Sequence, residues 1–349
     1  MDFHNRTRFP AMLFRGIIRG RRMFASLACR VTFDLVGEEL WPAAVQPWPI
    51  NPGPWDSPKG PFPGDDVFYR GGVDLFLFGS AVAPQGKPVP KMDVNFTVGK
   101  EYKRSLAISG DRVWEKKNGG FVPSAPKPFT SMPLVMANAF GGKDEWDELP
   151  VPFASNPEGK GFRVFEENVT GTPLPNIESP DRLLTVWNET PEPAGCSAPP
   201  PAYAVKVARF IEFDMQTGMM KKIDPKFYNT CFPDMIVPEL LEAGSQVRVE
   251  GVRRNGPLAF ALPKCPVRAH IRFHEDDRTM EPWVDQIGID VEASRVFVTY
   301  RLPFRYTIET FVKRITELLP SEPAFAAAEP EPEPSPEPGP EMMPAPVVA

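Results

Sequence analysis

The alternation of hydrophobic and polar residues along the chain predicts a body built mainly of β-strands. Apolar runs of strand length, several with every second position apolar, cover residues 22–34, 73–84, 92–98, 104–109, 258–263, 266–273 and 284–304. Turn-forming pairs separate them, with reversals expected at Gly110-Asp111, Asn118-Gly119-Gly120 and Asn255-Gly256. Strands with a turn about every eight to twelve residues are typical of an antiparallel sandwich or barrel.

Two further segments have helical patterns. Residues 134–140 would form a short, buried helix that Thr130 caps and that Gly141 ends in the left-handed conformation. After Thr307, apolar residues recur at helical spacing and predict an amphipathic helix lying on the body. These residues are Ile308, Phe311, Val312, Ile315, Leu318 and Leu319. The expected fold is therefore mainly β, with a few short helices.

The high proline content adds long loops to this predicted β fold. The chain has 45 prolines in 349 residues, against a usual share of about 5%, and proline breaks helices and central strands. Long, ordered, proline-rich loops are therefore expected at residues 41–64 and 151–202, the second around one candidate strand at 182–189. Tryptophans in the first loop would usually pin it onto the core. Alternatively, Trp48 and Trp55 could anchor a partner protein.

The charge distribution separates a body from a tail. Residues 1–319 are expected to form one β-rich domain, with two packed sub-domains split near 125–200 as a further option. Residues 320–349 have the composition of a disordered acidic tail, rich in proline and glutamate and without Lys or Arg. The six tail glutamates match the whole net charge of −6. A near-neutral body argues against nucleic acid as a partner.

The cysteines and the apolar runs bear on the compartment. Cys29, Cys196, Cys231 and Cys265 are widely spaced and form no CxxC pair, so buried free thiols are expected rather than disulfides. No run approaches the roughly 18 apolar residues of a membrane helix, and arginines interrupt any N-terminal leader. These features predict a cytoplasmic protein without membrane insertion.

The sequence singles out no catalytic, metal or cofactor-binding residue. His270 and His274 would lie on the polar face of one strand, about 13 Å apart and beside Arg268 and Arg272, which disfavours a shared metal ion. No GxSxG elbow, P-loop or GxGxxG follows a strand. A carbohydrate-active sandwich with two facing carboxylates remains open.

Polar residues at expected turns have a structural interpretation. Their side chains commonly bond to turn backbones, and membership of a binding pocket is the alternative. These residues are Asn156, Asn176, Asn229, Asp111, Asp224 and Asp234.

Several segments together resemble one bacterial family, the domain of unknown function 2169, found in type VI secretion loci. The segments are "GDRVW" at Gly110, "PFTSMPLVMANAFGG" at Pro128, "NPEGKGF" at Asn156, "LPNIESP" at Leu174, "DPKFYNTCFPD" at Asp224, "LAFALP" at Leu258 and a late "VFVTYR". The resemblance spans about Phe9 to Arg305. The chain departs from the family pattern in "PAGCS" at Pro193 and in Met235 after Asp234.

The resemblance implies a non-catalytic adaptor or chaperone that binds a secreted effector toxin and helps load it onto the VgrG or PAAR spike. It brings no catalytic residues or cofactor, and the motif residues would shape either the core or a partner groove built on the core. These are Trp114, Phe129, Met132, Pro133, Phe140, Gly141, Gly142, Asn156, Gly159, Asn176, Asn229 and Asp234. The alternatives are a glycosidase or lectin-like β-sandwich and a structural component of the secretion apparatus.

Overall fold

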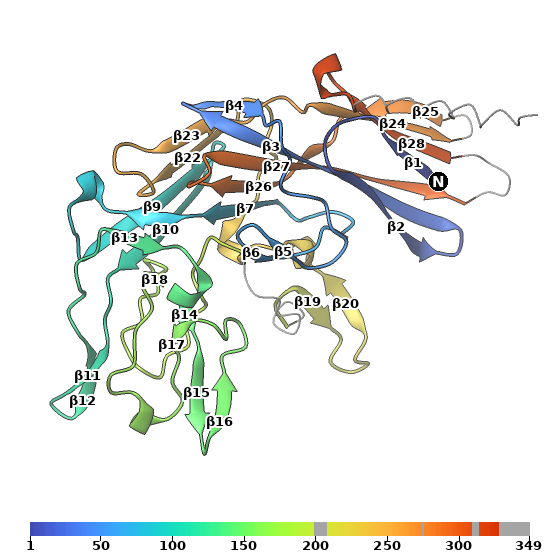
Figure 1. The fold of residues 1–349 in the computed structure, drawn as a ribbon. Helices are drawn as coiled ribbons and strands as arrows, with labels where there is room; N and C mark the ends of the chain where they lie inside the picture. Colours follow the sequence, from blue (N-terminus) through green and yellow to red (C-terminus); the bar gives the residue numbers. More distant parts are fainter. Residues whose placement is uncertain (199–207, 274–275, 309–313, 328–349) are drawn as a thin grey trace, which may run out of the picture.

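The computed structural model describes residues 1–198, 208–273, 276–308 and 314–327 (Figure 1). The expected mainly β fold with few short helices is confirmed, and the three larger sheets make it sandwich-like. The seven-stranded sheet runs β2 (Ala11–Arg19), β3 (Arg22–Val36), β27 (Arg295–Thr307), β26 (Trp283–Asp290), β7 (Val73–Phe78) and β21 (Ile236–Val237), with β4 (Glu39–Pro42) also paired to β3.

Two further sheets complete the body. The five-stranded sheet runs β18 (Ile177–Glu178), β10 (Tyr102–Ser109), β9 (Lys91–Val98), β22 (Gln246–Glu250) and β23 (Leu258–Ala261). The four-stranded sheet runs β1 (Asp2–Asn5), β28 (Arg314–Pro320), β24 (Val267–Phe273) and β25 (Asp276–Met280). One apolar core joins all three, with Leu75, Phe96 and Ile271 each contributing from a different sheet.

Short hairpins and bridges connect these sheets. They are β5 (Trp55–Ser57) with β6 (Gly60–Phe62), β8 (Ser80–Val82) with β13 (Ser131–Pro133), β11 (Trp114–Lys117) with β12 (Gly120–Pro123), β14 (Phe140–Gly141) with β17 (Lys160–Gly161), β15 (Lys143–Trp146) with β16 (Leu149–Pro152), and β19 (Ile211–Phe213) with β20 (Met220–Ile223). Residues 208–210 are α-helical, and the other described helices are single 3₁₀ turns, η1 (Pro84–Gly86), η2 (Met136–Asn138), η3 (Glu166–Asn168), η4 (Pro225–Tyr228), η5 (Pro233–Met235) and η6 (Pro323–Phe325).

Strands β11, β12 and β14–β17 with their connections form what we call the lower lobe, which hangs below the sheets in Figure 1. It has a small apolar cluster of its own, made by Trp114, Phe140, Phe162, Val169, Leu174 and Leu184. Strands β14–β17 of the lobe lie in the region near 125–200 where an optional sub-domain split was expected, and β11 and β12 precede that region.

The predicted helix at 134–140 is wrong. Residues 131–133 form β13, and only Met136–Asn138 make a 3₁₀ turn. The Asn156 side chain explains the difference, because its Nδ2 donates to the carbonyls of Met136 and Phe140, both at 2.9 Å. Gly141 has a φ of 147° rather than a left-handed helical value. A side chain there would meet the Asn156 carbonyl oxygen at 2.1 Å.

The predicted C-terminal helix is also wrong where the structure describes it. Residues 314–320 form β28, which pairs with β1 on one side and β24 on the other. Thr316 and Leu318 are fully buried with a residue between them, so the period is two. Pairing on both edges has overridden the local helical pattern.

Two expected strand features differ, and others hold. Residues 182–189 form no strand, and β10 does not pair with β11 across Gly110, because β18 takes that edge. The reversal at Asn118-Gly119 joins β11 to β12 as expected, with both residues at positive φ. The turn at Gly256 likewise lies between the paired β22 and β23.

The expected start of the tail at residue 320 falls too early. Phe325 packs on Phe9 with ring centroids 5.6 Å apart, and the backbone N–H of Ala327 donates to the Arg6 carbonyl at 2.9 Å. Residues 320–327 therefore contact the body. Residues 328–349, which hold the rest of the expected disordered tail, lie outside the described residues.

Candidate functional site

The two tryptophans expected to face a partner hold the loop onto the core. Trp48 is 2% exposed, and its ring lies 4.6 Å from Phe297, 5.4 Å from Phe62 and 6.0 Å from Trp55. Trp48 therefore offers no open surface in this structure, and Trp55 is half-buried against the same cluster. The structure supports the interpretation that these rings pin the loop.

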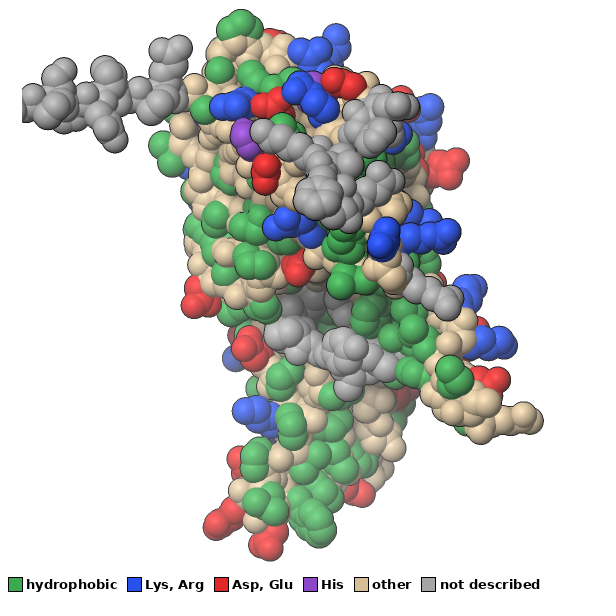
Figure 2. Space-filling model, turned by 90° about the vertical axis from the view of Figure 1, so that its right-hand side faces the viewer, with side chains coloured by type: hydrophobic (Ala, Val, Ile, Leu, Met, Phe, Trp, Pro, Cys, Tyr) green, Lys and Arg blue, Asp and Glu red, His purple; other side chains and the backbone are tan. Residues whose placement is uncertain are grey.

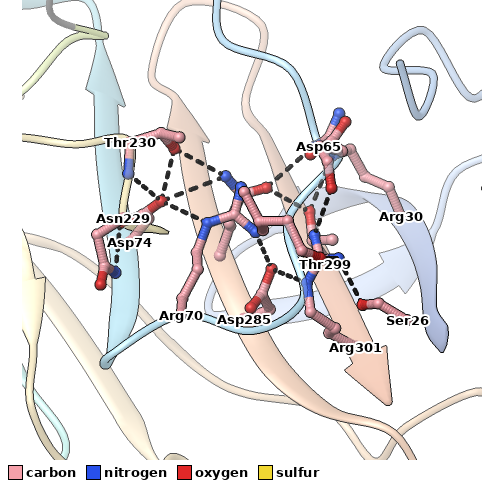
Figure 3. Close-up of polar contacts among 12 residues, drawn as sticks. Ser26, Arg30, Asp65, Arg70, Asp74, Asn229, Thr230, Asp285, Thr299 and Arg301 are labelled. Atoms are coloured by element: carbon pink, nitrogen blue, oxygen red, sulfur yellow. Dashed lines mark hydrogen bonds and ion pairs between the residues drawn. The ribbon is translucent and has the colours of Figure 1, made fainter. Parts of the chain in front are cut away.

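A buried polar network lies beneath that loop, on the seven-stranded sheet (Figure 3). Its charged members are three arginines and three aspartates whose side chains are at most 1% exposed: Arg30, Arg70, Arg301, Asp65, Asp74 and Asp285. Equal numbers of opposite charges in contact reduce the cost of burying each one.

Asp285 is the centre of one half of the network. It accepts from Arg70 and, at 2.9 Å, from Arg301 Nε. Arg301 then donates to the backbone carbonyls of Val67 and Asp65, at 2.9 and 3.1 Å. The ion pairs of strands β26 and β27 thus fix the backbone of the proline-rich loop.

Arg30 does the same from β3. It donates to Asp65 at 2.6 Å, to the Pro49 carbonyl at 2.5 Å and to Gln286 at 2.9 Å. The loop from Pro49 to Arg70 is therefore tied to the sheet at both ends by charged groups.

Asp74, on β7, connects the network to a second loop. It accepts from Asn229 Nδ2 at 2.8 Å, and from the Thr230 N–H and hydroxyl at 2.9 and 2.6 Å. Burial acts to raise the pKa of Asp74, but Arg70 and these donors outweigh it and lower the pKa. The network is enclosed, and its geometry positions loops.

The asparagines of the motifs hold irregular backbone in the same way. Asn156 and Asn176 are fully buried and Asn229 is 1% exposed. Asn176 donates to the Ser109 carbonyl at 2.9 Å, and Asn229 accepts from the Gly71 N–H at 2.9 Å. Each amide links two segments distant in sequence, so the structural interpretation is supported.

Most other motif residues also lie inside the fold. Trp114, Phe140 and Met132 are buried, Phe129 exchanges backbone hydrogen bonds with Val89, and Pro133 pairs with Ser80 in β13. Gly159 and Gly142 lie where a side chain would meet backbone atoms at 2.6 and 2.5 Å. Pro133 and Asp234 are exposed, and the Asp234 side chain is 62% exposed.

Asp234 lines a groove of about 600 Å³ at the edge of the five-stranded sheet. Apolar residues from two loops, Ala194, Phe232 and Pro233 among them, line one part of it. Arg104 comes from β10, and Arg182 from the turn after β18. Two segments of the family resemblance, "LPNIESP" and "DPKFYNTCFPD", meet here with "PAGCS", where the chain departs from the family pattern.

The groove lies beside the part of β10 that β18 does not cover. Strand β18 covers only Ala107 and Ile108 before the chain turns away at Ser179–Arg182. Among the described residues, β10 has no strand beside it from Tyr102 to Leu106 on that side. The Ser109 N–H points to this side, since it donates to Asn176. By alternation, the backbone groups of Lys103 and Ser105 point there too.

The charged side chains of the groove differ in how far they are paired. Arg104 is held at 3.0 Å from Asp234 and donates to the Ser179 hydroxyl at 3.2 Å. Its Nε is buried without a hydrogen-bond partner. Arg209 pairs with Glu192 at 2.5 Å. The groove thus combines guanidinium groups, an apolar wall and an open strand edge.

Arg104, Arg182 and Phe232 were not singled out from the sequence. The available signal in the sequence was the set of motif fragments, because each contributes part of the groove lining. Nothing in the local sequence shows that these fragments converge. The predicted partner-binding pair, Trp48 and Trp55, lies elsewhere, in the aromatic core.

The remaining candidate chemistry is sparse in the described part of the chain. No three His, Cys, Asp or Glu side chains lie grouped there so that they could hold a metal ion. His270, on β24, lies beside Asp277 of β25 and Glu317 of β28. His274 lies outside the described residues. Every described helix is too short or too polar to cross a membrane.

The four cysteines are free, and three of them are buried. Burial raises the pKa of Cys196 to about 12 and that of Cys265 to about 12. Such thiols stay protonated at neutral pH and are poor nucleophiles.

Comparison with known proteins identifies a family. Residues 19–301 match the model of a family described as "Uncharacterized protein conserved in bacteria (DUF2169)". No curated protein and no solved structure gives a significant match.

Removing Asp285 should destabilise the fold strongly. Asp285→Ala leaves two buried guanidinium groups without their shared carboxylate, so the free energy of unfolding should fall by about 3–5 kcal/mol. Urea denaturation measures this. The matched control is Asp34→Ala, which breaks the 2.8 Å pair with Arg295, where both side chains are at least 36% exposed. That loss should stay below about 1 kcal/mol, and equal losses would contradict the account.

Asp74 should make stability depend on pH in the acid range. Its pKa is lowered in the folded state, so its contribution is complete above the unfolded value of about 3.9 and is lost as the pH falls towards the folded value. The difference in unfolding free energy between the wild type and Asp74→Asn should therefore be constant near neutrality and shrink below about pH 4. A difference that widens in acid would rule this out.

Proposed function

The chain belongs to the DUF2169 family, and on that premise we propose that it is a non-catalytic adaptor or chaperone that binds another polypeptide. The observation that carries the proposal is the groove at the open edge of β10. A wall of apolar side chains, three arginines, three carboxylates and unpaired strand backbone lie together there.

The groove suits an extended segment of a partner protein. Such a segment would add to β10 as a strand, with main-chain hydrogen bonds to Lys103 and Ser105. Alternate side chains of the segment would then face Phe232 and Pro233. Acidic side chains or a terminal carboxylate would pair with Arg182, which has no ion-pair partner among the described residues.

The buried network supports this use of the groove. Asp74 binds the backbone of Thr230, two residues before Phe232. The Leu77 N–H donates to the Cys196 carbonyl at 2.7 Å, close to Ala194. Both apolar walls are thus anchored to β7, and an interface that is fixed before binding loses less entropy on association.

The partner follows from the family resemblance. The motifs resemble a family found in type VI secretion loci, so we propose that the segment belongs to an effector toxin and that the complex delivers it to a VgrG or PAAR protein in the cytoplasm. Two of the three carboxylates that line the groove favour binding over catalysis. Asp234 and Glu192 are engaged with arginines rather than facing one another.

The groove can be tested by charge reversal and by blocking the strand edge. Arg182→Glu should weaken binding of an effector that co-purifies with the wild-type chain by about tenfold or more. Lys103→Pro removes an outward-pointing N–H with which an added strand would pair, so it should weaken binding as well. An edge strand tolerates proline at such a position. Isothermal titration calorimetry with the purified effector measures both.

Two matched variants act as controls. Lys103→Ala removes the same side chain but keeps the N–H, and Arg268→Glu reverses the charge of an exposed arginine on β24. Both should bind like the wild type. Unchanged affinity in Arg182→Glu and Lys103→Pro would refute the groove. Turnover of a polysaccharide, or stable self-assembly without effector binding, would favour the alternative functions.

A further inference from the structure

The tip of the lower lobe exposes an aromatic pair. Trp146, at the end of β15, is 65% exposed, and Leu149 across the turn is equally exposed. The Trp146 ring stacks on Phe165, with centroids 6.1 Å apart and planes 29° apart. Val164, beside Phe165, is 46% exposed. We call these four apolar side chains, on the β15–β16 hairpin and the segment that packs beside it, the tip patch.

The tip patch is held rigidly by one buried carboxylate. Asp144, 2% exposed, accepts from the N–H groups of Val164 and Phe165 at 2.7 and 3.0 Å and from Asn168 Nδ2 at 2.8 Å. These bonds lower the pKa of Asp144 although burial acts to raise it. They fix β15 against the segment that carries Phe165.

The turn of the hairpin is equally constrained. Asp147 and Glu148 have φ of 50° and 65°, as a two-residue turn with both residues left-handed requires. Trp146 and Leu149 then lie opposite one another in the ladder. Holding such residues in this conformation costs energy, and the result is a fixed pair of apolar side chains at the tip.

Acidic side chains flank the members of the tip patch along the sequence. Five exposed carboxylates are close in sequence to its members: Glu145, Asp147, Glu148, Glu166 and Glu167. Lys143 is the only basic residue of the hairpin. At the bottom of the space-filling view, which is the end of the lower lobe, hydrophobic and acidic side chains lie together (Figure 2).

We propose that the tip patch is a second protein-binding surface, and that it takes a partner segment in which Lys or Arg alternates with large apolar residues. A cation over the free face of the Trp146 ring would gain cation–π attraction, and the acidic rim would pair with its neighbours. The apolar residues would pack on Leu149 and Val164.

Charge complementarity selects this occupant over others. The acidic rim repels nucleic acid and anionic lipid, whose phosphates need basic surfaces. A second copy of the chain docking tip to tip would bring like charges together. The groove at β10 uses other residues, and its lining has as many arginines as carboxylates, so the two surfaces bind different segments, and each can fail alone.

The test is selection from a random peptide library on phage, panned on the full-length chain and counter-selected on the Trp146→Ala variant. Enriched peptides should carry Lys or Arg next to Leu, Phe or similar residues. By fluorescence polarisation, the best synthetic peptide should bind Trp146→Ala about tenfold or more weakly than the wild type. Its affinity should fall as salt is raised.

Matched variants separate the tip patch from general stickiness. Trp41→Ala removes another tryptophan that is 60% exposed and close in sequence to the acidic Glu38 and Glu39, and it should bind the peptide normally. Glu166→Gln with Glu167→Gln should weaken binding, whereas Arg182→Glu in the groove should not. No enrichment, enrichment of acidic peptides, or equal losses in Trp146→Ala and Trp41→Ala would overturn the proposal.

Discussion

The rest of the structure depends on six charged side chains buried on the seven-stranded sheet. Ion pairs such as those of Arg70 with Asp74 and Asp285 are costly to bury. Here they stabilise loops that lack regular secondary structure. They tie down proline-rich loops that cannot form ladders of their own. A chain with so many prolines satisfies its loop backbone with side chains, and the buried asparagines extend the same solution into the lower lobe.

The buried charged groups also position segments of the two candidate binding surfaces. Asp74 binds the backbone of Thr230, whose loop continues into Phe232 and Asp234 at the groove. In the lower lobe, the Asp144 carboxylate binds the backbone of the segment that carries Phe165, as the Asp74 carboxylate binds the backbone beside the groove. Each candidate binding surface therefore includes an irregular segment whose backbone is bound by a buried carboxylate. Such segments can hold a defined shape without belonging to a large sheet.

The sequence predicted the strands well where the pattern was local. β3, β9 and β27 follow apolar runs, and the Asn118-Gly119 turn follows from its composition. It failed at residues 134–140 and 314–320, where Asn156 and pairing with two neighbouring strands override the helical pattern. The groove could not be predicted, because Arg104 and Arg182 meet only through the departure of β18 from β10.

The central claim is that the open edge of β10 receives a strand from another protein. Hydrogen–deuterium exchange of the full-length chain, with and without the partner effector, measures this directly. The amides of Lys103 and Ser105 should exchange fast in the free protein and become protected in the complex, while those of β9 stay unchanged. A complex that forms with no added protection at Lys103 and Ser105 would contradict the account.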